Sequence, residues 1–234
     1  MNIVVTGASS GIGYQASLLL SGNPSHNVIA ISRSEEKLKL LKSESLKKNS
    51  LSRLHIFSAD LSNENSVSAV SEKIKSGFGS VDILINNAGL LINKPFEELS
   101  LNDWLSVYST NVFGAVNIIR QLTPLMKRGS HILNISSMGG FQGSIKFKGL
   151  SAYSSSKAAL AGITECLAEE FKDRGIAVNC LCLGSVQTEM FNAAFPHSTA
   201  SASSAEMAAY ICGFALEGHR FFNGKILPVS NSTP

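Results

Sequence analysis

The sequence predicts an α/β fold built on a doubly wound parallel sheet, and three observations support this prediction. Short runs rich in β-branched residues alternate with longer segments of helical periodicity. The short runs are almost free of charge, as expected for strands of a parallel sheet covered by helices on both faces. A glycine-rich turn joins the first strand to the first helix. With right-handed crossovers, this alternation gives three layers, with the sheet in the middle.

Seven short apolar runs are predicted as strands. They are Asn2–Thr6, Asn27–Ser32, Leu54–Ser58, Val81–Asn86, His131–Ser136, Ala177–Leu183 and Lys225–Val229. The fourth run is typical, because no charge interrupts it after Asp82. The predicted strand order is 3-2-1-4-5-6-7, with ligands bound at the carboxyl ends of the strands, near the switch point between the first and fourth.

The segments between these strands are predicted as helices: Gly11–Ser21, Ser34–Asn49, Ser62–Phe78, Leu101–Lys127, Ala152–Arg174 and Ala205–Leu216. Apolar residues recur at helical spacing and define the inner faces. The second helix has Leu38, Leu41 and Leu46 among lysines, and the third has Val67, Val70 and Ile74. The long fourth helix would turn inward Trp104, Leu105, Tyr108, Val112, Val116 and Ile119.

Length and composition fit one domain over residues 1–234. The chain has 234 residues, of which 44% are apolar and 16% charged, so it can bury a full core. Its net charge of +3 is too small and dispersed for a nucleic-acid surface. No apolar run is long enough to span a membrane. The first predicted strand starts at Asn2, which leaves no room for a signal peptide, so we expect a cytoplasmic protein.

The cysteines and histidines form no recognisable metal or disulfide pattern. We expect Cys166, Cys180, Cys182 and Cys212 to be buried, reduced thiols. The five histidines are scattered, and no metal site is predicted. The one basic cluster is expected to be a solvated helix face: Lys37, Lys39, Lys42, Lys47 and Lys48.

The turn after the first strand has the properties of a dinucleotide-binding loop. Thr6–Gly13 reads Thr-Gly-Ala-Ser-Ser-Gly-Ile-Gly and opens a helix. Gly7 permits the tight turn, Gly11 removes the Cβ that would block a pyrophosphate, and Gly13 lets the helix pack close to the strand. The free N–H groups of the helix N-terminus then attract an anion.

The spacing of these glycines, together with four further motifs, resembles the short-chain dehydrogenase/reductase family, in its short single-domain branch. Three residues separate the first two glycines. The other motifs follow in the family's order: Asn86-Asn87-Ala88-Gly89, Asn111, Asn134-Ile135-Ser136-Ser137 and Tyr153-x-x-x-Lys157. The motifs span residues 6–188, and chance agreement of five ordered motifs is negligible. The resemblance implies a Rossmann fold and an oxidoreductase that uses NAD(P).

The end of the second strand favours NADP(H). An acid there would bind the 2′-hydroxyl of NAD, but this chain has Ser32 and Arg33, and a guanidinium suits a 2′-phosphate. The alternative is that Arg33 is a surface arginine and NAD(H) also binds. The predicted cofactor contacts are Gly7, Ser9, Ser10, Gly11, Ile12, Gly13, Ser32, Arg33, Asp60, Leu61, Asn87, Ala88, Gly89, Tyr153, Lys157, Gly184, Val186 and Thr188.

The resemblance assigns four catalytic residues. Tyr153 is the general acid in reduction and the base in oxidation. Lys157, on the same helix face, lowers the pKa of Tyr153 and bonds the nicotinamide ribose. Ser137 hydrogen-bonds the substrate carbonyl. It is chosen over Ser136 because the family uses the second serine of its Asn-x-Ser-Ser pattern, and strand alternation lets only one of the two face the site. Asn111 holds the water that relays protons to Lys157.

Two loops depart from the family pattern. The loop of residues 138–151 is about three residues longer than usual between Ser137 and Tyr153 and should border the substrate pocket. Its lysines, Lys146 and Lys148, either attract an anionic substrate tail or are simply solvated. Residues 189–204 should form a lid, whose Met190, Phe191 and Phe195 either line an apolar pocket or pack the lid on the core.

The predicted function is hydride transfer between NADP(H) and a carbonyl or secondary alcohol, most simply by a ketone, aldehyde or 3-oxoacyl reductase. The alternatives are a non-catalytic NADP-binding sensor or scaffold, and an epimerase or dehydratase. The intact catalytic positions argue against the first alternative, and the glycine spacing and compact C-terminal half against the second. The predicted partners are a small-molecule substrate and a second copy of the chain. A homodimer or homotetramer would form through Leu101–Lys127 and Ala152–Arg174, where Ala158, Ala161 and Gly162 permit close helix contact or pack on the sheet.

Overall fold

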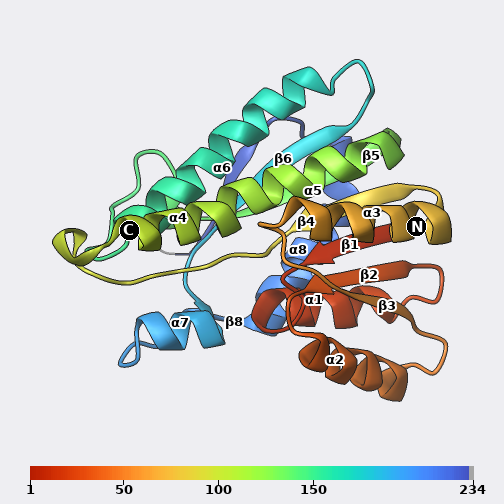
Figure 1. Cartoon of the computed structure of the whole chain (residues 1–234), viewed down its shortest axis with the longest axis horizontal. Helices are drawn as coiled ribbons and strands as arrows, with labels where there is room; N and C mark the ends of the chain where they lie inside the picture. Colours follow the sequence, from red (N-terminus) through yellow and green to blue (C-terminus); the bar gives the residue numbers. More distant parts are fainter. Residues whose placement is uncertain (232–234) are drawn as a thin grey trace.

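The computed structural model describes residues 1–231 as a twisted parallel sheet between two layers of helices (Figure 1). The strands of this sheet are β1 (Asn2–Thr6), β2 (Asn27–Ser32), β3 (Arg53–Ser58), β4 (Val81–Asn86), β5 (Met126–Ser137), β6 (Ala177–Leu183) and β9 (Ile226–Val229). Their order is β3-β2-β1-β4-β5-β6-β9, and every pairing is parallel. The predicted fold class and order are therefore confirmed, with β9 as the seventh strand.

The helices divide between the two faces of the sheet. Their bounds are α1 (Gly11–Ser21), α2 (Glu35–Lys48), α3 (Glu64–Phe78), α4 (Leu101–Tyr108), α5 (Gly114–Leu122), α6 (Ser151–Glu170), α7 (Glu189–Ala194) and α8 (Ser204–Glu217). Helices α1, α2 and α8 lie on one face, and α3, α5 and α6 on the other (Figure 1). Alternate residues of β1 serve the two layers: Ile3 and Val5 pack towards α1 and α8, while Val4 packs towards α3 and α5.

The predicted continuous helix Leu101–Lys127 is wrong. Helix α4 ends at Tyr108, a π-helical turn covers Ser109–Phe113, and α5 runs to Leu122. A short 3-10 turn that contains Pro124 follows, and β5 begins at Met126. Proline ends the helical hydrogen bonding because it lacks an N–H. Asn111 is buried within this π turn. The periodicity of a regular helix gives no sign of such a turn, so the sequence did not predict it.

Several side chains that were predicted to be buried are exposed. Leu46, Leu105 and Val116 are exposed, as is Cys166, whereas the other three cysteines are buried. The lid contains the short helix α7, and two short paired strands, β7 (Val186–Gln187) and β8 (Ala202–Ser203), lie at its ends. Within residues 1–231, no helix is both long and apolar enough to cross a membrane.

Candidate active site

A cleft of about 820 Å³ opens at the carboxyl ends of the sheet strands, beside the switch point between β1 and β4. Its walls include almost every predicted cofactor contact. These are Gly7, Ser9, Ser10, Gly11, Ile12, Ser32, Arg33, Asp60, Leu61, Asn87, Ala88, Gly89, Tyr153, Lys157, Gly184, Val186 and Thr188. Ser137 also lines the cleft, so segments far apart in the sequence meet around one space.

The glycine turn forms one wall and depends on missing side chains. Gly7 and Gly11 have positive φ values of 67° and 54°. Gly13 does not line the cleft; a Cβ there would stand 2.5 Å from both the Gly7 carbonyl oxygen and Asn87 Nδ2, so this glycine allows close packing as predicted. Asn87 fastens the turn by donating to the Thr6 carbonyl oxygen at 3.1 Å. The turn is thus held by the Asn87 side chain and by the close packing of Gly13 against the Gly7 carbonyl.

The N-terminus of α1 faces the same space without an acidic neighbour. No acidic residue lies in the first turn of this helix, and the side chain of its N-cap residue, Ser10, makes no capping bond. The N–H groups of a first helical turn lack partners within the helix, and they carry the positive end of the helix dipole. A phosphate group of a nucleotide fits this wall by charge and by hydrogen bonding.

The far end of the cleft, after β2 and β3, carries cations and one carboxylate. Arg33 is exposed on the cleft wall, and within residues 1–231 no side-chain hydrogen bond or ion pair engages its guanidinium. Asp60 accepts bonds from the backbone N–H and the hydroxyl of Ser62, at 3.0 and 2.7 Å. The side-chain bond from Ser62, with a smaller effect of Arg33, holds the pKa of Asp60 below its usual value. Lys37 lies here too, which the prediction of a fully solvated lysine face missed.

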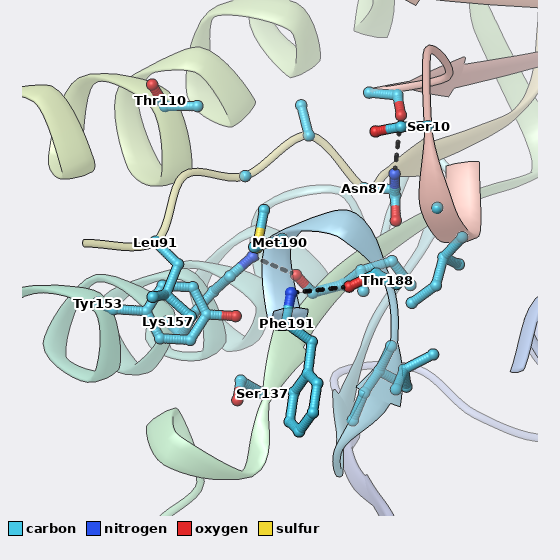
Figure 2. Close-up of a pocket in the computed structure, with 18 of the residues that line it drawn as sticks. Ser10, Asn87, Leu91, Thr110, Ser137, Tyr153, Lys157, Thr188, Met190 and Phe191 are labelled. Carbon is cyan, nitrogen blue, oxygen red and sulfur yellow. Dashed lines mark hydrogen bonds between the residues drawn. The ribbon is translucent and has the colours of Figure 1, made fainter. Parts of the chain in front are cut away.

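Tyr153, Lys157 and Ser137 gather at the opposite end of the cleft (Figure 2). Tyr153 and Lys157 project from one face of α6, with the ammonium nitrogen 5.9 Å from the centre of the phenol ring. Burial raises the pKa of Tyr153 to about 12, against a hydrogen bond with Ser137 that lowers it. Burial lowers the pKa of Lys157 to about 8, and its ammonium donates to the Ile135 carbonyl oxygen at 2.8 Å.

The two neighbouring serines of β5 have different roles in the structure. The hydroxyl of Ser136 is buried and donates to the backbone carbonyl of Lys157 at 2.8 Å, which ties β5 to α6. The hydroxyl of Ser137 accepts a bond from the Gly139 N–H at 3.2 Å and lies on the Tyr153 side. Both serines line the cleft, but the Ser136 hydroxyl is taken up by the Lys157 carbonyl, whereas that of Ser137 lies beside Tyr153.

Asn111 is buried behind the cleft wall and does not line it. Its amide oxygen accepts from the Leu90 N–H at 2.7 Å, and its amide nitrogen donates to the Leu90 carbonyl and to the Ser156 hydroxyl, both at 2.9 Å. A Cβ on Gly89 would be 3.5 Å from both Asn111 Oδ1 and Lys157 Nζ. Asn111 therefore adjoins Lys157 through the space beside Gly89.

The end of the cleft beside Tyr153 is lined mostly by apolar side chains. From the two loops it receives Phe147, Met190, Phe191 and Phe195, so the pocket-wall alternative describes these lid residues. The prediction missed Leu91 and Thr110, which also line the cleft, and it did not single out Met138 and Leu150 within the 138–151 loop that it placed at the pocket. These four lie outside the family motifs, and no pattern in the sequence marks them.

The loop lysines do not face this cleft. Lys146 and Lys148 line a separate cavity, and Lys146 Nζ donates to the Phe141 carbonyl and the Ser144 hydroxyl at 2.6 and 2.7 Å. The hypothesis that they attract an anionic substrate tail into the cleft is therefore not supported. The Lys146 ammonium is instead bonded within its own loop. Residues 1–231 also contain no cluster of three potential metal ligands.

The sequence and structure comparisons agree on one family. A family profile described as short chain dehydrogenase matches residues 1–199. An uncharacterised oxidoreductase of Bacillus subtilis (strain 168) is 34% identical over 81% of this chain and 66% of its own length. The 3-oxoacyl-[acyl-carrier-protein] reductase of Staphylococcus aureus (strain Mu50 / ATCC 700699) is 32% identical over 81% of this chain and 76% of its own. A short chain dehydrogenase from Burkholderia cenocepacia J2315, solved in complex with NADP, superposes with a TM-score of 0.87, at 25% identity, over 99% of this chain and 96% of that one.

Proposed function

The chain belongs to the short-chain dehydrogenase/reductase family, and from this premise we propose that it reduces a ketone, aldehyde or 3-oxoacyl group with NADPH. As a family member it is an oxidoreductase that acts on CH–OH or C=O groups with a nicotinamide nucleotide. The observation that carries the proposal is the meeting of Tyr153, Ser137 and Lys157 in the cleft that the glycine turn also lines. The relative named as a 3-oxoacyl reductase supports the direction of reduction, and the similar structure solved with NADP supports the choice of cofactor.

The cleft fits a dinucleotide. The Gly7–Gly13 turn and the N-terminus of α1 would hold the pyrophosphate, and Asp60 and Leu61 would border the adenine. Asn87, Ala88 and Gly89 would lie along the ribose nearest to Lys157, with Gly184, Val186 and Thr188 at the nicotinamide. Ser9, Ser32 and Arg33 would bind the 2′-phosphate, since no acid stands at the end of β2 to prefer the hydroxyl of NAD. When bound, NADPH supplies the hydride.

The side chains of this chain supply the proton and the polar support. Ser137 donates a hydrogen bond to the substrate carbonyl oxygen, whose negative charge grows during reduction. The Tyr153 hydroxyl then gives its proton to this oxygen. A phenol with a pKa of about 12 is a poor match for neutral pH, and the Lys157 ammonium beside it favours the phenolate that remains. Asn111 would hold a water next to Lys157, through which the proton is restored.

The remaining properties follow from the same proposal. We assign residues 1–234 to one oxidoreductase domain. Exposed apolar side chains on the surface of α4, α5 and the π turn between them favour a homodimer or homotetramer: Leu101, Leu105, Phe113 and Val116. Four cysteines that remain free thiols fit a reducing compartment such as the cytoplasm. Light scattering at micromolar concentration tests the assembly, and a monomer would contradict it.

The test of the function begins with binding and then asks for turnover. Purified protein is titrated with NADPH and NADH, and nucleotide oxidation is followed against ketones, aldehydes and 3-oxoacyl thioesters. We expect tighter binding of NADPH and turnover of at least one carbonyl class. Tyr153→Phe should lower kcat about a thousandfold or more while NADPH binding persists, because the substitution removes only the hydroxyl group that donates the proton. Turnover that survives this substitution would contradict the assigned proton donor, and binding without any turnover would favour a sensor.

A further inference from the structure

Two cations, not one, line the end of the cleft assigned to the 2′-phosphate. Arg33 directly follows β2, and Lys37 stands on the first turn of α2; both are exposed and both line the cleft. Ser34 lies between them in the sequence and caps α2, accepting a bond from the Lys37 N–H at 3.3 Å. This capped turn places the Lys37 side chain on the same side as Arg33.

Lys37 is not free: it forms an ion pair with the lid. Its ammonium nitrogen lies 3.1 Å from Glu189 Oε2, at the first residue of α7. Among the ion pairs of residues 1–231, this is the one that joins two walls of the cleft, since the others link neighbours along a helix or residues away from the cleft. Arg33, by contrast, has no such partner in the described part of the chain. The pair thus connects the nucleotide wall to the lid.

The lid has few other attachments. Helix α7 spans only residues 189–194 and buries none of its side chains. Thr188 caps it by accepting from the Phe191 N–H at 3.1 Å, and Asn93 Nδ2 donates to the Ala194 carbonyl at 2.8 Å at its other end. One end of α7 is therefore fastened to α2 through Lys37, and the other end to the loop that follows β4. The Lys37–Glu189 pair is exposed and therefore weak, but within the described part of the chain it is the one ion pair that fastens α7.

Among the acids near Lys37, Glu189 is the one that would compete with a bound anion for the Lys37 ammonium. Glu35 is already paired with Lys39 at 2.8 Å, and Asp60 accepts both of its bonds from Ser62. Glu36 is the other acid on this first turn. A 2′-phosphate carries about −1.5 to −2 charges at neutral pH, which two cations match better than one. The 2′-hydroxyl of NAD(H) is neutral and offers Lys37 nothing in exchange for Glu189.

We propose that Lys37 is a specificity-determining residue shared between Glu189 and the 2′-phosphate, so that NADP(H), and not NAD(H), releases α7 from α2. This inference rests on the proposed use of NADP(H). In the free protein Glu189 holds Lys37, and the lid is fastened over the nucleotide end. A 2′-phosphate draws Lys37 to itself beside Arg33, and the N-terminal end of α7 loses its ion pair.

Binding measurements on four variants test the shared cation. Lys37→Met should weaken NADPH binding about tenfold and change NADH binding by less than about twofold. Glu189→Gln should strengthen NADPH binding by up to about fivefold, because the competitor is gone and an exposed ion pair is weak. In Lys37→Met/Glu189→Gln the second substitution should have no further effect on NADPH binding. Lys42→Met, an exposed lysine of α2 outside the cleft, is the matched control and should leave the NADPH-to-NADH ratio unchanged.

Hydrogen exchange tests the release of the lid. Amides of residues 189–195 should exchange faster in wild-type protein with saturating NADP+ than with saturating NAD+. In Glu189→Gln they should exchange equally fast with either nucleotide. Equal exchange with both nucleotides in the wild type would overturn the release, since Lys37 would then have kept Glu189.

The outcomes separate this inference from the proposed function. Wild-type protein that binds NADPH no better than NADH would contradict the proposed cofactor preference itself. Wild-type protein that prefers NADPH, with an unchanged preference in Lys37→Met, would overturn only the role of Lys37. An equal gain in NADPH affinity from Glu189→Gln with and without Lys37 would also overturn it, because the gain would then come from loss of the repulsion between the Glu189 carboxylate and the phosphate.

Discussion

The two ends of the cleft are built in different ways. The glycine turn is enclosed by backbone, so that a single added carbon at Gly7 or Gly13 would stand within 2.7 Å of neighbouring atoms. The substrate end is closed by the 138–151 loop and the lid, whose walls are side chains such as Phe147 and Phe191. A wall of backbone accepts one ligand shape, whereas a wall of loop side chains can be changed without moving the sheet. Substitutions at the two ends of the cleft should therefore have different consequences.

The largest effect should come from filling the backbone wall. Gly13→Ala places a Cβ 2.5 Å from the Gly7 carbonyl oxygen and from Asn87 Nδ2, so the turn must shift. Overpacking of this kind costs about 1–3 kcal/mol, and if the shift falls on the turn it lowers NADPH affinity by about ten- to a hundredfold. Isothermal titration measures the affinity, and chemical unfolding measures the stability.

The matched control is Gly77→Ala in α3, where the added carbon has no neighbour within 4 Å. Alanine is the better helix former, so we expect this variant to gain about 0.5–1 kcal/mol of stability and to keep its NADPH affinity. Equal affinities in Gly13→Ala and the wild type would show that the turn adapts, and the contrast between the two ends would fail.

Acidification should weaken the framework beneath the cleft. His131 is fully buried on β5, with Nδ1 2.9 Å from the Ala215 carbonyl oxygen and Nε2 beside Asn179. Burial lowers its pKa to about 4. The unfolded chain, with an ordinary histidine pKa of about 6.5, binds the proton first, so stability is full above pH 6.5 and falls as the pH drops towards 4.

At pH 5 this histidine alone should remove about 2 kcal/mol of the stability present at pH 7. Urea unfolding at both pH values measures the difference, and His131→Gln should reduce the pH dependence. The same dependence in His131→Gln and the wild type would place the acid sensitivity elsewhere.

The smallest effect should come from trimming the side-chain wall. Phe191 lies in the cleft from α7, and the lid buries little against the core. Phe191→Ala should raise the KM of a carbonyl substrate about fivefold, while NADPH affinity stays within about twofold and stability within about 0.5 kcal/mol. Steady-state kinetics and nucleotide titration on the same preparation separate the two. If NADPH affinity falls by a larger factor than the substrate KM rises, the proposed division of the cleft into a nucleotide end and a substrate end is wrong.

Motifs with local causes could be predicted from sequence. Gly13 is one example: the sequence predicts that it lets the helix pack close to the strand, and a Cβ there would stand 2.5 Å from the Gly7 carbonyl oxygen. The choice of Ser137 over Ser136 followed from the family's serine pattern, and in the structure the Ser136 hydroxyl donates to the Lys157 carbonyl. The break of the long helix at Ser109–Phe113 could not be predicted, because buried bonds between Asn111 and Leu90 accompany it, and these two residues are 21 positions apart.

The sequence by itself determined the order of strands and helices and the glycine turn, because periodicity and short-range sterics decide both. The set of residues around Tyr153 followed from the resemblance of its motifs to those of the family. Only the tertiary structure decided that Lys37 meets Glu189, that Lys146 turns away from the cleft, and that Leu91 and Thr110 join its wall. These depend on contacts between segments far apart in the chain. Side chains on exposed loops obey no repeat that a sequence could display, and their partners are chosen only when the sheet brings the loops together.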